Sequence, residues 1–286
     1  MEICDVTVIL TAYKRIDSLR SQIDSLKKQS FLPKEIWLFQ DKVNKDYTIT
    51  LEKSLLDEFD NVFIATDNIG VWGRFDFARK VHTKYVCIFD DDTIPGSRWI
   101  ENCMENMKKQ RGIYGAIGVA VLNSNNYPYS GYCRVGWQRP NSETCMVDFV
   151  GHSWFFEKEW LHYMFDEAKD MKKYKYAAED MSLSYAALLH GINTYVPAHP
   201  FSNYDLWGSK PDLGTILGQN NVSLSGNGND IRMNNAIKEL EVKGWNFVYK
   251  RDPVYIKKLK RISDKAHRIV VIKKILRLFE RDHKTF

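Results

Sequence analysis

Residues 86–93, Val-Cys-Ile-Phe-Asp-Asp-Asp-Thr, place three successive aspartates directly after a short apolar run. The apolar residues predict a buried strand over 84–89, and the aspartates predict that the strand ends there. Side chains alternate along extended backbone, so Asp90 and Asp92 are expected on one side and Asp91 on the other. Clustered carboxylates repel one another unless a cation compensates them, and their oxygens suit Mg²⁺ or Mn²⁺. The alternative is a solvated acidic turn or a cap on the following helix.

Strand-like and helix-like patterns alternate over the first 120 residues that contain this segment. This alternation favours right-handed βαβ units and therefore an α/β fold with a mostly parallel central sheet and helices on both faces. The second half is less regular, although strand patterns continue. The predicted strands are 3–10, 35–40, 61–65, 84–89, 113–122, 146–150 and 192–196, and the predicted helices are 16–29, 49–59, 97–107 and 180–190.

Polar side chains follow four of these strands, at the point where each strand ends. They are residues 11–15, Asp41, residues 68–74 and the aspartate triplet. Ligands of open α/β sheets bind at the carboxyl ends of the strands, so this placement predicts an enzyme. The segment 68–74 contains two glycines and an arginine, but it matches neither a dinucleotide fingerprint nor a P-loop. Residues 197–230 are rich in Gly, Asn, Ser and Pro, which predicts a functional or mobile loop.

A second acidic pair, Glu179-Asp180, directly precedes an apolar helical pattern. A carboxylate at a helix start is well placed to deprotonate an acceptor hydroxyl. It is equally well placed as an ordinary cap, where it interacts favourably with the helix dipole. Two tryptophans, Trp154 and Trp207, are candidates for stacking on a sugar ring, with packing in the core as the alternative.

Composition excludes several classes of protein. The 286 residues are 44% hydrophobic and 27% charged, which excludes disordered and low-complexity architectures. No long uncharged apolar run is present, so no membrane span is expected. The acidic N-terminal residues do not fit a signal peptide. The five cysteines lack metal-binding spacing, so buried thiols in a reducing, cytoplasmic setting are expected.

Positive charge is concentrated in residues 251–286. This segment contains 12 lysines and arginines against four acidic residues, a net charge of +8, whereas the preceding 250 residues have a net charge of −3. Residues 268–279 show an amphipathic helical pattern with basic side chains on the polar face. An anionic membrane surface is one partner for such a helix, and a helix packed on the body with solvated charges is the alternative. Nucleic acid is not expected as a partner.

Together these segments resemble family 2 glycosyltransferases. Residues 6–15 are similar to the first strand and loop of that family, and residues 89–92 are similar to its metal-binding DxD motif. Glu179-Asp180 falls where the family carries its E-D motif with the catalytic aspartate. The order and spacing agree over residues 3–200, and exostosin-type transferases are a near neighbour because they share a similar Asp-Asp-Asp-Thr segment. Two departures concern the nucleotide contacts: Lys14 stands where the family has Asn, and Asp41 is single rather than paired.

The resemblance implies a glycosyltransferase-A (GT-A) fold over residues 1–250, with 1–120 as the nucleotide-sugar half, 121–250 as the acceptor half and 251–286 as a helical extension. It also implies three groups of site residues. The nucleotide-binding group is Thr11, Tyr13, Arg15, Asp41, Asn68, Arg74 and Asp91. Within it, Asp41 would contact the nucleobase. The metal-binding group, for Mn²⁺ or Mg²⁺, is Asp90, Asp92 and His199, the last as a late third ligand. The catalytic pair is Asp180, as the base, and Glu179.

The function implied is metal-dependent transfer of a sugar from a nucleotide-diphosphate donor to a saccharide or lipid-linked saccharide. A UDP-sugar is the favoured donor. The setting implied is the synthesis of a glycan or a cell-surface polysaccharide. The acidic pair favours inversion, and the exostosin likeness leaves retention open. A sugar nucleotidyltransferase is an alternative, although residues 11–15 lack its Gly-rich loop. A non-catalytic carbohydrate-binding module on the same fold is another. The expected location is the cytoplasm. If residues 251–286 bind an anionic membrane, the enzyme would lie peripherally on the inner face of that membrane.

Overall fold

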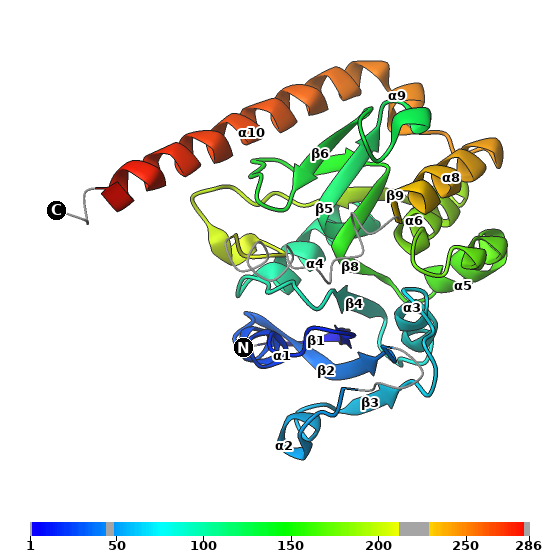
Figure 1. The fold of residues 1–286 in the computed structure, drawn as a ribbon, viewed down its shortest axis with the longest axis vertical. Helices are drawn as coiled ribbons and strands as arrows, with labels where there is room; N and C mark the ends of the chain where they lie inside the picture. The colour runs from blue at the N-terminus through cyan, green and yellow to red at the C-terminus, as the bar shows by residue number, and fades with distance from the viewer. Residues whose placement is uncertain (1, 44–48, 212–228, 283–286) are drawn as a thin grey trace.

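Four parallel strands form the N-terminal half of the central sheet, in the order β3-β2-β1-β4 (Figure 1). The computed structural model describes residues 2–43, 49–211 and 229–282, with side chains up to residue 272. The four strands are β1 (Glu2–Ala12), β2 (Phe31–Gln40), β3 (Asn61–Ile64) and β4 (Tyr85–Phe89). β1 and β4 are buried over most of their length, as expected for parallel strands covered on both faces. The predicted α/β fold is confirmed.

The second half of the sheet mixes parallel and antiparallel strands. β8 lies between β4 and β5 and runs antiparallel to both, while β9 pairs parallel with β5 and antiparallel with β7. The single strand expected over 146–150 is instead two strands that meet at Asp148, whose side chain accepts backbone N–H bonds from Val121 and Val248. The strands are β5 (Gly112–Val121), β6 (Tyr132–Gly136), β7 (Cys145–Val147), β8 (Phe149–Glu157) and β9 (Asn193–Val196).

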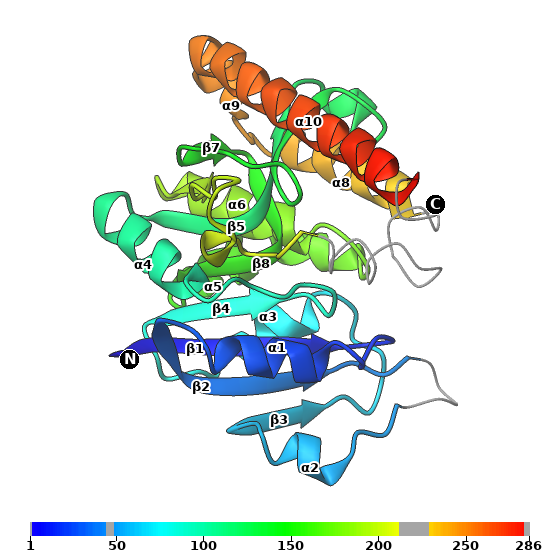
Figure 2. The ribbon, with the colours of Figure 1, turned by 90° about the vertical axis from the view of Figure 1, so that its left-hand side faces the viewer.

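Helices cover both faces of this sheet (Figures 1 and 2). One face carries α1 (Leu19–Leu26) and α4 (Trp99–Lys109), and the other carries α3 (Gly73–Ala78), α5 (Trp160–Glu167) and α6 (Glu179–Leu189). The helix expected over 49–59 is only the single turn α2 (Lys53–Leu56). Short 3₁₀ turns are η1 (Ser124–Asn126), η2 (Lys169–Lys173) and η3 (Tyr204–Leu206).

Three helices complete the chain: α8 (Asn229–Val242), α9 (Val248–Arg251) and α10 (Pro253–Asp282). α10 packs its first half on the body through Ile256 and Leu259, and Ser263 Oγ donates to Arg134 O at 2.7 Å. It thereby covers the otherwise open edge of β6, and its far end extends away from the body (Figure 1). The predicted helix over 268–279 is confirmed in the backbone, but its side chains from 273 onward lie outside the described residues, as do residues 212–228 of the predicted loop.

All five cysteines are free and buried, as predicted. Trp207, considered as a sugar platform, is 1% exposed and belongs to the core. Within the described part of the chain, no helix combines the length and apolar character needed to cross a membrane.

Candidate active site

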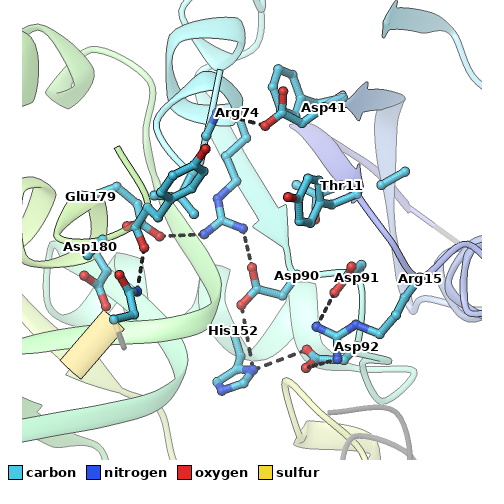
Figure 3. A pocket seen from close by; sticks show the side chains of 18 of the residues that line it. Thr11, Arg15, Asp41, Arg74, Asp90, Asp91, Asp92, His152, Glu179 and Asp180 are labelled. Atoms are coloured by element: carbon cyan, nitrogen blue, oxygen red, sulfur yellow. Dashed lines mark hydrogen bonds and ion pairs between the residues drawn. The ribbon is translucent and has the colours of Figure 1, made fainter. Parts of the chain in front are cut away.

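One pocket of about 250 Å³ opens at the carboxyl ends of β1, β2 and β4 (Figure 3). Its other side is formed by the first turn of α6 and the start of α8. The structure brings together here every predicted site residue except His199: Thr11, Tyr13, Arg15, Asp41, Asn68, Arg74, Asp90, Asp91, Asp92, Glu179 and Asp180.

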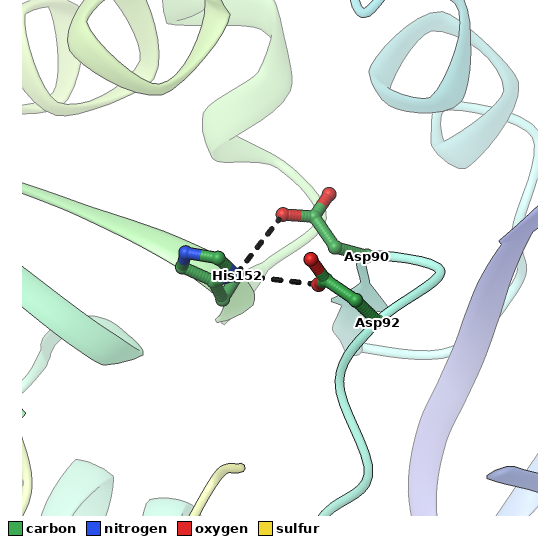
Figure 4. Close-up of side chains that lie close together, drawn as sticks. All are labelled: Asp90, Asp92 and His152. Atoms are coloured by element: carbon green, nitrogen blue, oxygen red, sulfur yellow. Dashed lines mark hydrogen bonds and ion pairs between the residues drawn. The ribbon is translucent and has the colours of Figure 1, made fainter. Parts of the chain in front are cut away.

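Asp90, Asp92 and His152 each offer a ligand atom to a common position (Figure 4). The three atoms lie within 4.8 Å of one another, with His152 Nδ1 3.4 Å from Asp92 Oδ1 and 3.7 Å from Asp90 Oδ2. The backbone fixes this meeting, because Asp90 N donates to His152 O at 3.0 Å where β8 runs beside β4.

Two arginines engage the opposite oxygens of these carboxylates. Arg15 pairs with Asp92 Oδ2 at 3.1 Å, and Arg74 pairs with Asp90 Oδ1. The carboxylate oxygens that face His152 are therefore the ones the arginines leave unused. Burial acts to raise the pKa of Asp92, but His152 and Arg15 outweigh it and hold that pKa below its ordinary value. Asp92 is thus charged at neutral pH, as a metal ligand must be.

Backbone strain surrounds the same pocket. His152 has a φ of 62°, Trp137 a φ of 61° and Ala178 a φ of 70°, and these are the non-glycine residues with positive φ in the described ranges. His152 and Ala178 line the pocket, and the Trp137 ring lies 3.8 Å from the His152 ring between centroids. Left-handed backbone is costly outside glycine and collects at functional sites. In this chain the left-handed backbone at His152 directs its imidazole toward the carboxylates of Asp90 and Asp92.

The expected ligand role of His199 is wrong. His199 is 2% exposed and lies outside the pocket, with Nδ1 2.9 Å from Pro197 O and Nε2 3.2 Å from Arg139 O. Its ring also packs edge-on against Trp207, with centroids 4.8 Å apart. Burial lowers the pKa of His199 to about 4, so this histidine is a neutral core residue.

Arg74 connects the carboxylate cluster to the acidic pair of α6. Its Nη2 donates to Glu179 Oε1 at 2.8 Å, while its other terminal nitrogen contacts Asp90. The guanidinium lies 4.5 Å from the Trp154 ring centroid, and Trp154 is 2% exposed, so this indole supports Arg74 and is not available to a sugar. The Glu179 carboxylate is therefore occupied in holding Arg74.

Asp180 lies in the first turn of α6, beside Glu179 and open to the pocket. Its Oδ1 accepts a hydrogen bond from Met181 N at 2.7 Å. Burial, and then the neighbouring charge of Glu179, raise the pKa of Asp180 well above its ordinary value. A carboxylate with a raised pKa is a stronger base, which suits removal of a proton from a hydroxyl.

At the other end of the pocket, Asp41 shapes the loop that follows β3. Its carboxylate accepts backbone N–H bonds from Lys42 at 2.9 Å, Ile69 at 2.7 Å and Gly70 at 2.8 Å. Asn68 Nδ2 donates to Lys42 O at 2.6 Å and ties the same loop to the end of β2. Both oxygens of Asp41 are engaged by the backbone, so the predicted contact with a base stays a prediction.

The loop after β1 forms the adjoining wall. Thr11 Oγ1 donates to Phe89 O at 2.9 Å, and Tyr13 also faces the pocket. Arg15 reaches across to Asp91 Oδ1 at 2.8 Å. Burial raises the pKa of Asp91 to about 7 against the opposing charge of Arg15. The three aspartates thus have different surroundings, and Asp91 points away from the cluster with His152.

A sequence model described as "Glycosyl transferase family 2" matches residues 7–170, more than half of the chain. The chain belongs to glycosyl transferase family 2. No curated protein matches it. Among solved structures, it is similar to S. aureus TarS, with 15% identity, a TM-score of 0.45 and coverage of 70% of this chain and 37% of that one. A second structure, TarS 1-349 in complex with UDP, gives 15% identity, a TM-score of 0.46 and coverage of 69% and 58%. The chain thus spans less than two thirds of either TarS chain.

The divalent metal implied by the family 2 resemblance fits the residues present. Two carboxylate oxygens and one imidazole nitrogen converge, and the remaining carboxylate oxygens are already neutralised by arginines. Carboxylate oxygens suit Mg²⁺ and Mn²⁺ alike. The Asp90, Asp92 and His152 cluster of this family 2 chain could therefore hold a divalent ion.

The pocket of this family 2 chain also has polar and apolar lining residues that were not predicted as site residues, among them His152, Tyr176, Asn229 and Met233. His152 is carried by β8, and only the pairing of β8 with β4 brings it to the aspartates. Tyr176, Asn229 and Met233 line the side next to Asp180, where Asn229 Nδ2 donates to Tyr176 O at 2.7 Å. Nothing in the local sequence predicts that α8 returns to this pocket, because that return depends on packing between distant segments.

Proposed function

We propose that this chain transfers a sugar from a nucleotide-diphosphate sugar to a hydroxyl of a saccharide or lipid-linked saccharide. A UDP-sugar is the donor we favour, and glycan or cell-surface polysaccharide synthesis is the setting. One observation supports this most: Arg74 links a candidate metal carboxylate, Asp90, to Glu179, the neighbour of the candidate base Asp180, within a single pocket. A leaving group, a reacting centre and a base must be held together in this way for group transfer.

The nucleoside would lie between the loop after β1 and the loop that Asp41 shapes. Tyr13 offers an aromatic face there, and Asn68 offers an amide for polar contact. Arg15 and Asp91 lie between this region and the cluster with His152, where the ribose and diphosphate would follow.

Asp90, Asp92 and His152 would hold Mn²⁺ or Mg²⁺. A bound divalent ion supplies positive charge that stabilises a departing diphosphate. Arg74 would stabilise the same charge from the side of α3, because its guanidinium is fixed in advance by Glu179 and Trp154. Such prior orientation avoids reorganisation when negative charge develops.

Asp180 would accept the proton of the attacking acceptor hydroxyl. Its raised pKa makes it basic, and its neighbour Glu179 is unavailable because it is paired with Arg74. Glu179 is therefore a positioning residue in this proposal. A base on the acceptor side favours an inverting reaction, in which the hydroxyl attacks opposite the leaving group.

The basic C-terminal helix would place the enzyme on the inner, cytoplasmic face of an anionic membrane. On α10 the side chains of Lys257, Lys265 and Arg268 are exposed, as are the apolar Val271 and Ile272. Basic and apolar side chains together suit an interfacial helix. A lipid-linked acceptor would then be available at the same surface.

Calorimetric titration with a panel of nucleoside diphosphates, with Mn²⁺ and then with EDTA, tests the donor class. We expect UDP to bind with Mn²⁺ and to lose most of its affinity in EDTA. If no nucleotide binds to folded protein, the proposal fails and the non-catalytic carbohydrate-binding alternative gains support. Asp92→Ala should behave like EDTA, because it removes one of the three converging ligands.

A further inference from the structure

Two arginines beside strand β6 lack an acidic partner. Arg134 lies on β6 and Arg139 lies in the turn that follows, and among the described side chains neither has a carboxylate oxygen within 4.0 Å. Arg134 Nη2 donates to Tyr132 Oη at 3.3 Å, and Arg139 Nη1 lies 3.4 Å from Ser263 Oγ. Arg134 Nε is buried and has no hydrogen-bond partner. An unsatisfied buried N–H is costly, and here it belongs to a cation.

The two guanidinium groups also act on each other. Burial, and then the positive charge of Arg134, lower the pKa of Arg139, and they outweigh the opposing effects of Tyr132 and Asp264. Like charges that are partly removed from water destabilise a fold unless an anion compensates them. Both arginines keep part of their surface exposed, so an anion from solution can reach them. Neither lines the pocket described above, so the donor diphosphate is not that anion.

A row of aromatic rings joins this basic pair to the catalytic region. The Arg134 guanidinium lies 5.6 Å from the Tyr132 ring centroid, and the Tyr132 and Tyr127 rings meet edge to face at 5.4 Å. Tyr127 belongs to the loop between β5 and β6, so these ring contacts join that loop to Arg134.

The wall between Arg134 and Asp180 is held in place by α8. Asn234 Nδ2 of α8 donates to Tyr127 O at 2.6 Å and to Ser124 O at 3.2 Å. The loop between β5 and β6 is thus fixed to the helix whose first turn lines the pocket beside Asp180. A saccharide whose hydroxyl reaches Asp180 would extend along this wall toward β6.

We propose that Arg134, assisted by Arg139, binds an oxyanion of the acceptor, a phosphate or carboxylate carried by the saccharide near the hydroxyl that is glycosylated. The inference rests on the proposed function and specifies its acceptor as an anionic glycan. A guanidinium presents its N–H groups as a planar fork that matches such oxyanions, and the exposed parts of Arg134 and Arg139 are where the anion would bind.

The test titrates trehalose phosphate and neutral trehalose into the full-length protein, without nucleotide or metal. We expect the phosphorylated sugar to bind about tenfold more tightly or better, and Arg134→Gln to remove that preference. Arg134→Lys, which keeps the charge but not the planar guanidinium, should retain part of it. Arg98→Gln is the matched control, because Arg98 is an arginine paired with Glu101 beside α4, and it should bind like the wild type.

Three results would overturn the proposal. They are equal affinity for the two sugars, unchanged affinity in Arg134→Gln, and loss of the preference in Arg74→Gln, which would place the phosphate in the donor pocket. Binding to vesicles with and without phosphatidic acid distinguishes an oxyanion on a sugar from one on a lipid headgroup. Arg134→Gln should bind these vesicles as the wild type does. If Arg134→Gln loses vesicle binding but keeps its preference for the phosphorylated sugar, the proposal is contradicted. UDP is titrated separately with Mn²⁺, so a failure of the proposed function is distinguished from a failure of this site.

Discussion

Replacing Arg74 by Gln should destabilise the fold as well as the site. Arg74 and Glu179 have side chains only 10% and 9% exposed, and they form an ion pair at 2.8 Å. Removing one partner of a buried pair costs about 3–5 kcal/mol, because the other charge is left buried and uncompensated. The second partner, Asp90, is 24% exposed and can recover some hydration. We therefore expect a loss near the lower limit, about 3 kcal/mol of unfolding free energy, or about a hundredfold in the folding equilibrium.

Urea unfolding of four proteins measures this effect: the wild type, Arg74→Gln, Glu179→Gln and the double variant. The double variant should be more stable than the sum of the two single losses predicts, because it leaves neither charge unpaired. The coupling should be at least about 2 kcal/mol at mildly alkaline pH.

The pH dependence of Arg74→Gln has a defined sign. Burial raises the pKa of Glu179 and Arg74 lowers it, so this pKa rises further when Arg74 is absent. A carboxyl group whose pKa is raised on folding becomes less costly as pH falls toward that pKa, because the folded protein binds the proton more readily. The loss caused by Arg74→Gln should therefore shrink between about pH 8 and about pH 5. An equal loss at both pH values, or additive single losses, would refute this reasoning.

Three further predictions concern other parts of the molecule. His152→Ala should weaken Mn²⁺ binding by about tenfold or more and Mg²⁺ binding less, because it removes the only nitrogen ligand among the three converging atoms; equal effects in a metal titration would argue against a ligand role. Asp148→Asn should cost about 1–3 kcal/mol in urea unfolding, since one of two buried N–H groups loses its acceptor, and an unchanged midpoint would contradict this. Lys265→Gln with Arg268→Gln should reduce flotation with anionic vesicles, and undiminished flotation would make α10 purely structural.

The N-terminal half could be predicted because its information is local. β1 and β4 are apolar runs that stay buried, and each ends where polar residues begin. The residues at those ends then share one pocket, because parallel strands present their carboxyl ends at one edge of the sheet. Apolar runs and strand ends are visible in a single sequence.

The rest depends on contacts between distant segments. His152 reaches the aspartates only because Ser153 on β8 pairs with Phe89 on β4, a match separated by more than 60 residues. His199 looked equivalent from its place after a strand, yet backbone carbonyls face both of its ring nitrogens in the core. β6 was missed because Tyr132–Gly136 contains an arginine and a glycine in five residues, and it is a strand through its pairing with β5 and its cover by α10.

Release of nucleoside diphosphate from a panel of nucleotide sugars tests the central claim most directly. The wild type with Mn²⁺ should release UDP from at least one UDP-sugar, and the rate should rise when the correct saccharide acceptor is added. Asp180→Asn should bind the same donor but lose acceptor-dependent release, because it removes the proposed base while leaving the cluster of Asp90, Asp92 and His152 intact. Acceptor-dependent release by Asp180→Asn at the wild-type rate, or no release from any donor by folded wild-type protein, would contradict the account.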